Sequence, residues 1–291
     1  MKSQLLYYCL IVPISRLPYW MIYGVSHLLY VVLYQWIGYR KKVVRKNIER
    51  VFADRTPAWR LQLERDFYRH FCDLICETVK QFHISQSDAE QRMKHLNIAV
   101  FAPFAQKGQS VIIAGGHMGN WELWGVSAAL AIPHEIIGVY KRLSDPFFDQ
   151  KLRSSRGKWG TKLVATKEIA QYLKDHVNDL KATVLAIDQS PANPQKAYWT
   201  SFLGQETASY FGPEKLAQEW NMPIVYGHIV KTKRGHYETT YELVCEDPQQ
   251  MGYGQIIELL NQKLEADILA HPHLWLWSHK RWKHQRLVFF K

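Results

Sequence analysis

Short apolar runs alternate with segments of helical periodicity between residues 110 and 270, and this alternation constrains the fold more than any other feature. The apolar runs have the length of strands and fall at 110–114, 135–140, 162–166, 182–188, 223–230 and 237–244. Helical patterns lie between or after them, at 121–130, 167–178, 212–220 and 253–270. The alternation predicts an α/β fold, with a mixed, largely parallel sheet flanked by helices.

A long amphipathic helix is predicted ahead of this region, over residues 56–83. Its apolar stripe keeps the three-four spacing of a buried face, with Phe67, Phe71, Leu74, Ile75, Val79 and Phe82. Cys72 and Cys76 lie one helical turn apart within this pattern, so we expect both to be reduced core residues. The four cysteines form no CxxC and lack the clustered ligands of a structural zinc site, so no metal is expected.

The amino-terminal segment carries an uncharged run of 22 residues, Leu17 to Gly38. As one helix it would measure roughly 33 Å, enough to cross a hydrocarbon core of about 30 Å. A basic cluster follows at 40–50, which under the positive-inside rule places the remainder in the cytoplasm. We therefore predict a membrane anchor over 1–38, either a single span or a helix lying in the interface, and a catalytic domain over 39–291.

The formal net charge of +11 implies an anionic partner, which could be nucleic acid, a lipid surface or an acidic protein. No helix-turn-helix, zinc-finger or RNA-binding signature is present, and an apolar anchor is unexpected in such a protein. The sequence therefore predicts a membrane protein that does not bind nucleic acid.

The stretch Ala114–Gly125, AGGHMGNWELWG, places His117 five residues ahead of Glu122. On one continuous helix these side chains would lie roughly 140° apart and could not easily meet. Gly119 permits a tight turn and Asn120 is a good N-cap, so the helix can begin between the two residues. We then expect the Glu122 carboxylate to accept a hydrogen bond from one ring nitrogen of His117 and leave the other as a base.

A histidine held in this way can deprotonate an alcohol as the alcohol attacks an acyl carbonyl. The same pair could activate water in a lipid esterase, and a loop histidine can also simply satisfy a backbone carbonyl. The chain has neither a GxSxG nucleophile motif nor an HExxH metal motif. The sequence therefore offers no clear side-chain nucleophile. None is required if the acceptor hydroxyl attacks directly, and no covalent enzyme intermediate then forms.

The chain resembles the lysophospholipid acyltransferase superfamily and, within it, the bacterial lipid A biosynthesis (late, Kdo-dependent) acyltransferases. GGHMGNWE, residues 115–122, matches the HX4D/E motif of that family. Four further segments are similar to family blocks: VYKRLSDPFFD (139–149), RSSRGKWG (153–160), the Asp-Gln and Phe-x-Gly segments within 186–217, and LWLWSHKRWK (274–283).

The resemblance implies an enzyme at the cytoplasmic face of the cell inner membrane. It would transfer a fatty acyl chain from acyl carrier protein, or from a coenzyme A thioester, to a hydroxyl of an anionic lipid acceptor. No cofactor beyond this acyl co-substrate is implied. His117 would be the general base and Glu122 its orienting partner. The substrate-binding candidates are Arg156, Arg153, Asp188, Gln189, Tyr140, Lys141 and Asn120.

Several of these residues also have structural interpretations. Arg153, Arg156 and Lys158 could form a solvated basic face, and Asp188 could cap a loop after a strand. The tryptophans and cations of 274–283 could be ordinary core and rim or an interfacial belt. The acceptor could be a lipid A precursor, another glycolipid, an aminolipid or a lysophospholipid. A non-enzymatic protein that binds anionic lipid is the alternative of a different class.

Overall fold

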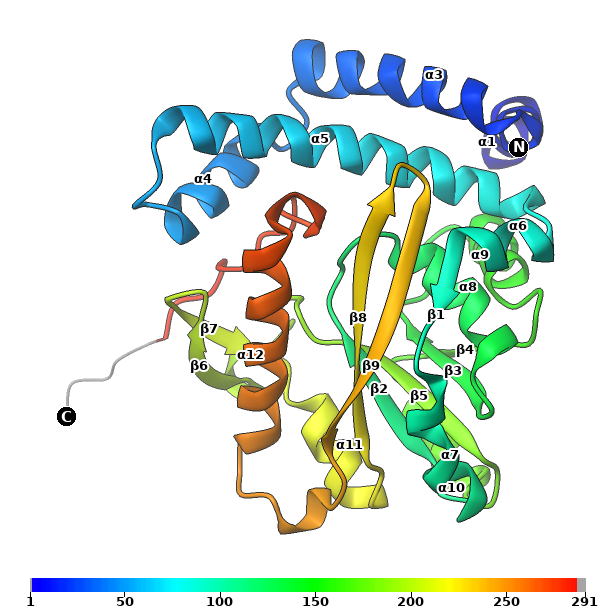
Figure 1. Ribbon diagram of the computed structural model, residues 1–291, viewed down its shortest axis with the longest axis vertical. Helices are drawn as coiled ribbons and strands as arrows, with labels where there is room; N and C mark the ends of the chain where they lie inside the picture. Colours follow the sequence, from blue (N-terminus) through cyan, green and yellow to red (C-terminus); the bar gives the residue numbers. More distant parts are fainter. Residues whose placement is uncertain (1, 287–291) are drawn as a thin grey trace.

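The computed structural model describes residues 2–286, so residues 287–291 of the predicted catalytic domain lie outside the described residues. A seven-stranded sheet, in the order β1-β9-β8-β2-β5-β3-β4, runs through the molecule (Figure 1). Strands β2, β3, β4, β5 and β8 are parallel to one another, whereas β1 and β9 run in the opposite direction. The strand bounds are β1 Met93–His95, β2 Val111–Gly115, β3 Glu135–Tyr140, β4 Lys162–Ala165, β5 Lys181–Ala186, β8 Ile224–Lys233 and β9 His236–Cys245. The predicted mixed, largely parallel sheet is confirmed.

Helices cover both faces of this sheet, and strand β2 shows how the faces divide. Ile112 and Ala114 belong to the core on the α12 side, whereas Val111 and Ile113 belong to the core on the α8 side. The helices near the sheet are α6 Gln86–Arg92, α7 Ala102–Gln106, α8 Trp121–Ala131, α9 Pro146–Arg156, α10 Ile169–Asp175, α11 Gly212–Trp220 and α12 Gln255–Ala270. The hairpin of β6 Tyr198–Phe202 and β7 Gln205–Ser209 forms a separate small sheet that the sequence analysis missed.

The long helix α5, Pro57–Lys80, confirms the predicted amphipathic segment and crosses the carboxyl ends of the parallel strands (Figure 1). Thr56 begins it, because its side chain accepts a hydrogen bond from the N–H of Trp59 at 3.2 Å. Cys72 and Cys76 are buried free thiols, as predicted.

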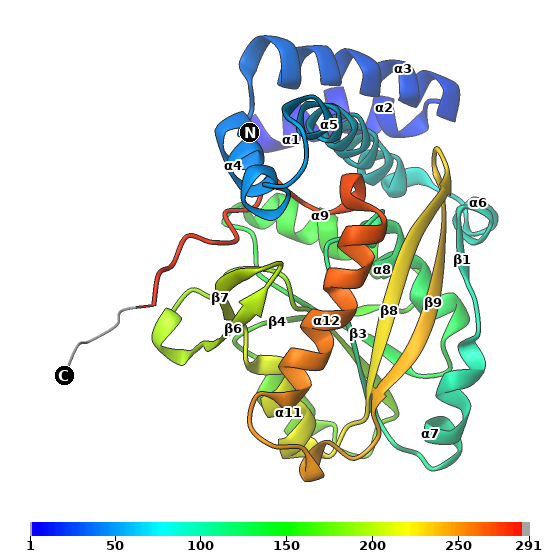
Figure 2. The ribbon, with the colours of Figure 1, turned by 60° about the vertical axis from the view of Figure 1, so that its left-hand side comes forward.

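The amino-terminal residues form a helical layer over α5, in which α3 runs along α5 (Figures 1 and 2). This layer consists of α1 Lys2–Leu6, the π-helical turn Tyr7–Ile11, α2 Val12–Arg16, α3 Tyr19–Tyr30 with its π-helical continuation Val31–Ile37, and α4 Lys41–Val51. Within the described residues, no single helix is both long and apolar enough to cross a membrane. By length and composition only one bent pair qualifies, Tyr19–Ile37 with α4, at an angle of 89°. The predicted single span over Leu17 to Gly38 is not confirmed.

The carboxy-terminal segment after the short 3₁₀ turn Pro272–Leu274 packs inside the molecule. Trp275, Trp277 and Arg281 are among the largest fully buried side chains. Asn47 of α4 fastens this segment, since its amide donates to the carbonyls of Trp277 (2.9 Å) and His279 (2.8 Å). The interpretation of these buried residues as an interfacial belt is wrong, because they form part of the core.

Candidate active site

The site lies where two neighbouring parallel strands end. Gly115, the last residue of β2, is in register with Ala186, the last residue of β5, and the N–H of Ile187 donates to the carbonyl of Gly115 at 3.0 Å. Parallel strands present their carboxyl ends at the same edge of a sheet. His117 and Asp188, each two residues beyond its strand, are therefore brought side by side.

A hydrogen bond joins the imidazole of His117 to the carboxylate of Asp188, with Nδ1 and Oδ1 2.6 Å apart. The other carboxylate oxygen, Oδ2, accepts from the backbone N–H of His117 and from the indole N–H of Trp275, both at 2.9 Å. Asp188 is buried, and 16% of the His117 side chain remains exposed. The carboxylate is thus fixed by three N–H donors and in turn fixes the ring.

The pair has shifted titration behaviour. Burial alone would lower the pKa of His117, but the Asp188 carboxylate outweighs it, so the pKa lies above its ordinary value. Burial alone would raise the pKa of Asp188, but the neighbouring His117 holds it well below the usual range. Each group therefore stabilises the charged form of the other.

The second ring nitrogen, Nε2 of His117, faces Gln189, whose amide Nε2 lies 3.2 Å away. Since an amide NH₂ can only donate, Nε2 accepts, and the ring proton resides on Nδ1 toward Asp188. This is the tautomer in which Nε2 is available as a base. Gln189 itself is exposed.

Glu122 makes no hydrogen bond to His117 in the described part of the chain, so the geometry differs from the expected pairing. Its carboxylate is held by Arg156, with Oε2 2.9 Å from Nε and Oε1 2.6 Å from Nη2. Arg156 ends α9, which returns its guanidinium to the first turn of α8, where Glu122 lies. The position expected for Glu122 is occupied by Asp188 because β5 lies next to β2 in the sheet.

The sequence was also compared with models of known protein families. The family model for bacterial lipid A biosynthesis acyltransferases matches residues 3–284. The chain belongs to this family. It is accordingly an acyltransferase of the lipid A biosynthesis family, which makes it an enzyme of the transferase class. A comparison with curated protein sequences gave no significant match.

In this acyltransferase, the turn that carries His117 has the local structure that its sequence predicts. Gly119 adopts a φ of +55°, and a Cβ there would lie 2.8 Å from Cγ2 of Ile229, so the position requires glycine. Asn120 caps α8, with its side-chain oxygen accepting from the N–H of Leu123 at 2.8 Å. The predicted helix start between His117 and Glu122 is therefore confirmed.

Within the described residues, Arg153, Tyr140 and Lys141 make no hydrogen bond to this pair. Arg153, one turn before Arg156, is exposed and lines a groove of about 500 Å³ with Gln150 and Tyr172. Tyr140 is buried and donates to Asp149 at 3.1 Å, while Lys141 is exposed.

Lys158 is not part of a solvated basic face. Its ammonium donates to the backbone carbonyls of Gln81 and Ile84, and burial lowers its pKa to about 8.

Trp275 contributes to the site, although the sequence did not predict this role. Its segment matched the family, but a tryptophan near the end of a chain has no local pattern that points to Asp188. Among the described residues no cluster of three or more potential metal ligands exists.

Proposed function

We propose that this enzyme transfers a fatty acyl chain from a thioester of acyl carrier protein, or of coenzyme A, to a hydroxyl of a lipid A precursor. One observation carries the proposal: His117 is held by Asp188 through Nδ1 and presents Nε2 as a base. An O-acylation needs such a base, because a neutral alcohol is a poor nucleophile.

In the proposed reaction, Nε2 of His117 takes the proton of the acceptor hydroxyl as its oxygen attacks the thioester carbonyl. The tetrahedral intermediate collapses, the C–S bond breaks, and the imidazolium returns its proton to the departing thiolate. Asp188 stabilises the imidazolium formed between these two steps. The enzyme forms no covalent intermediate.

Gln189 marks the position of the acceptor hydroxyl. Its amide donates to Nε2 of His117, where the hydroxyl must donate during the reaction. Since Gln189 is exposed, its side chain can move aside when the acceptor enters.

We assign Arg156 to substrate contact, as the family resemblance suggests. Glu122 holds the guanidinium through Nε and Nη2, which leaves Nη1 directed elsewhere without a partner among the described residues. That N–H group can donate to an acceptor phosphate or to the developing oxyanion of the thioester carbonyl.

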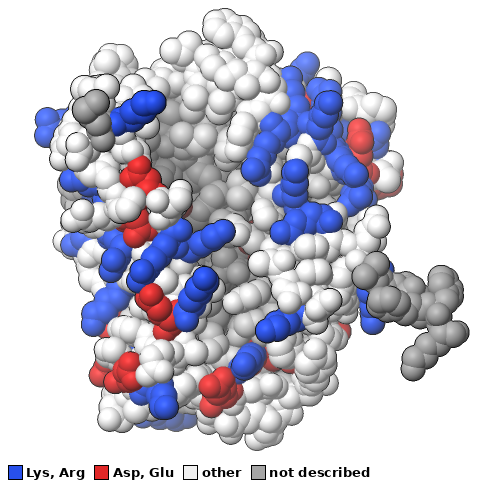
Figure 3. All heavy atoms as spheres, turned by 180° about the vertical axis from the view of Figure 1, so that it is seen from behind, with Lys and Arg blue, Asp and Glu red and all other residues white. Residues whose placement is uncertain are grey.

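Basic residues flank a hollow in the surface seen in Figure 3. One group of lysines and arginines lies on the side of α4 and the other on the side of α9 and β4. An acidic carrier protein and an anionic lipid would each be attracted to such a surface.

We further propose that the amino-terminal helices lie on the cytoplasmic surface of the inner membrane. Their outer face exposes large apolar side chains, including Trp20 at 75% and Trp36 at 74% exposure. Helix α4 follows directly with exposed Lys42 and Lys46. Tryptophan beside lysine is typical of helices that bind the interface of anionic membranes.

The decisive experiment is lipid mass spectrometry of cells with the gene, without it, and with His117→Ala in its place. We expect the gene to add one acyl chain to a lipid A precursor and His117→Ala to abolish the addition while the protein stays in the membrane fraction. An acyl gain on a phospholipid or aminolipid instead would identify another acceptor. Retained transfer by purified His117→Ala would exclude the base role. The absence of any acylated product from the wild type would contradict the proposed transfer.

A further inference from the structure

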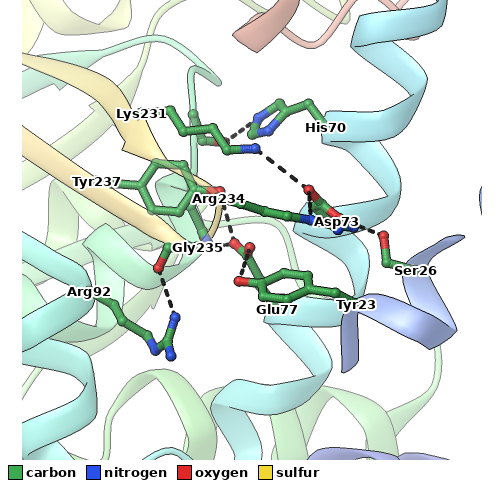
Figure 4. A network of polar contacts seen from close by, with 12 residues as sticks. Tyr23, Ser26, His70, Asp73, Glu77, Arg92, Lys231, Arg234, Gly235 and Tyr237 are labelled. Carbon is green, nitrogen blue, oxygen red and sulfur yellow. Dashed lines mark hydrogen bonds and ion pairs between the residues drawn. The ribbon is translucent and has the colours of Figure 1, made fainter. Parts of the chain in front are cut away.

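We propose that Glu77 of helix α5 is a positioning residue of the active site, which holds the turn Gly119–Asn120 and thereby keeps His117 against Asp188. The inference rests on the proposed role of His117 as the base. Figure 4 shows the network in which Glu77 lies, between α3, α5 and the hairpin of β8 and β9.

Glu77 is buried, with only 5% exposure, and its carboxylate contacts three separate elements. Oε2 accepts from the side-chain amide of Asn120 at 2.7 Å and from the hydroxyl of Tyr237 on β9 at 2.9 Å. Oε1 accepts from the hydroxyl of Tyr23 on α3 at 3.1 Å. The carboxylate thus ties the catalytic turn to both the sheet and the amino-terminal helical layer.

Asn120 lies three positions after the catalytic histidine, with two residues of backbone between them. Asn120 is fully buried and uses both ends of its amide, Oδ1 to cap α8 and Nδ2 to bind Glu77. The side chain therefore has one orientation, and that orientation fixes the first turn of α8. Loss of the acceptor oxygen at Glu77 should therefore displace either the cap or the turn.

A second contact from α5 holds the same turn. His70 lies two helical turns before Glu77, and its Nε2 donates to the carbonyl of Gly119 at 3.1 Å. Burial keeps this imidazole neutral by lowering its pKa to about 3. The N–H of Gly119 donates to the carbonyl of Leu274 at 3.1 Å, so the glycine is held from both sides.

Asp73 pairs with Arg234 and Lys231, whereas no ion pair to Glu77 is found among the described residues. A purely structural role therefore explains Glu77 less well than Asp73. Burying a carboxylate costs free energy that an apolar residue of similar size would not cost, and its hydrogen bonds at most offset that cost. What the carboxylate adds is a fixed geometry at Asn120. Misplacement of a reacting group by about 1 Å can cost about 100-fold in rate.

Asp73 offers a matched control within the same helix. It lies one turn before Glu77, is 4% exposed, and likewise bonds α3 and the hairpin, through Ser26 (2.6 Å) and Arg234 (2.6 Å). It makes no hydrogen bond to the catalytic turn. Loss of Asp73 should therefore weaken the fold without moving His117.

The test compares Glu77→Ala with Asp73→Ala and Glu77→Gln in the full-length enzyme. Histidine NMR follows the titration of His117, with its signal assigned by its absence in His117→Ala, and acyl transfer is measured against pH. In Glu77→Ala, we expect kcat to fall by about 10–100-fold with KM within about three-fold. The His117 titration and the acidic limb of kcat should both move to lower pH, because the ring loses contact with Asp188.

The two control variants should leave the titration of His117 unchanged. Asp73→Ala should lower the melting temperature only. Glu77→Gln should recover most of the activity, because its amide oxygen can still accept from Asn120. If Glu77→Ala fails to fold, Asn120→Ser provides the same test, since serine keeps the cap of α8 but cannot reach Glu77.

The proposal is overturned if Glu77→Ala, or Asn120→Ser in its place, leaves the His117 titration unchanged and loses activity only in proportion to stability. It is equally overturned if Asp73→Ala shifts the titration as far as Glu77→Ala does. The NMR titration needs no turnover, so it decides the role of Glu77 even if His117→Ala proves active and the proposed function fails.

Discussion

Replacement of Asp188 by asparagine tests the central assignment of the site, that this carboxylate and not Glu122 orients the base. The variant keeps the size of the side chain but removes its charge and one of its two acceptor oxygens. Asp188 receives three N–H donors, from the ring and backbone of His117 and from Trp275, at 2.6–2.9 Å. An asparagine cannot accept all three.

The expected loss of kcat follows from the tautomer that His117 adopts in this variant. An asparagine that keeps its oxygen toward the backbone of His117 and Trp275 turns its NH₂ toward Nδ1, which must then accept. The ring proton moves to Nε2, and the nitrogen that should act as base is blocked. In hydrolytic triads this exchange costs about 10⁴-fold in kcat. We expect a loss of about 10³–10⁴-fold here, which corresponds to about 4–5.5 kcal/mol in activation free energy.

The assay is single-turnover acyl transfer from acyl carrier protein to a lipid A precursor, with the melting temperature measured for every variant. Glu122→Gln is the matched comparison, because it also neutralises one carboxylate beside the site. It breaks the two-point ion pair with Arg156, and we expect a loss of about 10–150-fold, the equivalent of about 1.5–3 kcal/mol.

The assignment of Asp188 as the orienting carboxylate is refuted if folded Asp188→Asn retains kcat within ten-fold of the wild type. It is also refuted if Glu122→Gln loses as much kcat as Asp188→Asn and shifts the acidic limb of the pH–rate profile equally far. In that case Glu122 acts on His117 directly during turnover, and the pairing with Asp188 belongs to the resting enzyme.

Three further outcomes are expected. Because Asp188 raises the pKa of His117 and the base must be neutral, kcat/KM in a pH–rate profile should fall as pH drops through a value above that of an ordinary histidine; a midpoint at or below the ordinary value contradicts the pairing. Gly119→Ala should lower the free energy of unfolding by about 1–3 kcal/mol in urea titrations, because φ is positive and a methyl meets Ile229; an unchanged value would exclude strain there. Burial alone would lower the pKa of His228, but nearby carboxylates, led by Asp267, outweigh it and raise the pKa. The ion pair between His228 and Asp267 therefore stabilises the fold below about pH 6.5, and this stabilisation is lost as pH rises through the raised pKa. The melting-temperature difference between wild type and His228→Gln should therefore shrink from pH 6 to pH 9. A constant difference would contradict a stabilising role of this ion pair.

Local patterns in the sequence determined most of the secondary structure around the site. The apolar stripe and capping threonine of α5, the strand at 135–140 and the helix that begins after Asn120 follow from periodicity and from the conformations of glycine and asparagine. These features depend on residues a few positions apart, so the sequence contains the information directly. The turn that presents His117 and the family motif around it could be predicted for the same reason.

The partner of the histidine could not be predicted in this way. Asp188 meets His117 because β5 pairs with β2 in register, although two strands and three helices separate them along the chain. Trp275 and Glu77 reach the same turn from the carboxy-terminal segment and from α5, contacts that no local pattern specifies. Hydropathy likewise could not distinguish a membrane span from a helix packed along α5, since both require an apolar face. Local sequence was enough to predict which residue can act as a base. The carboxylate that orients it follows from the order of strands in the sheet, which depends on contacts between distant segments.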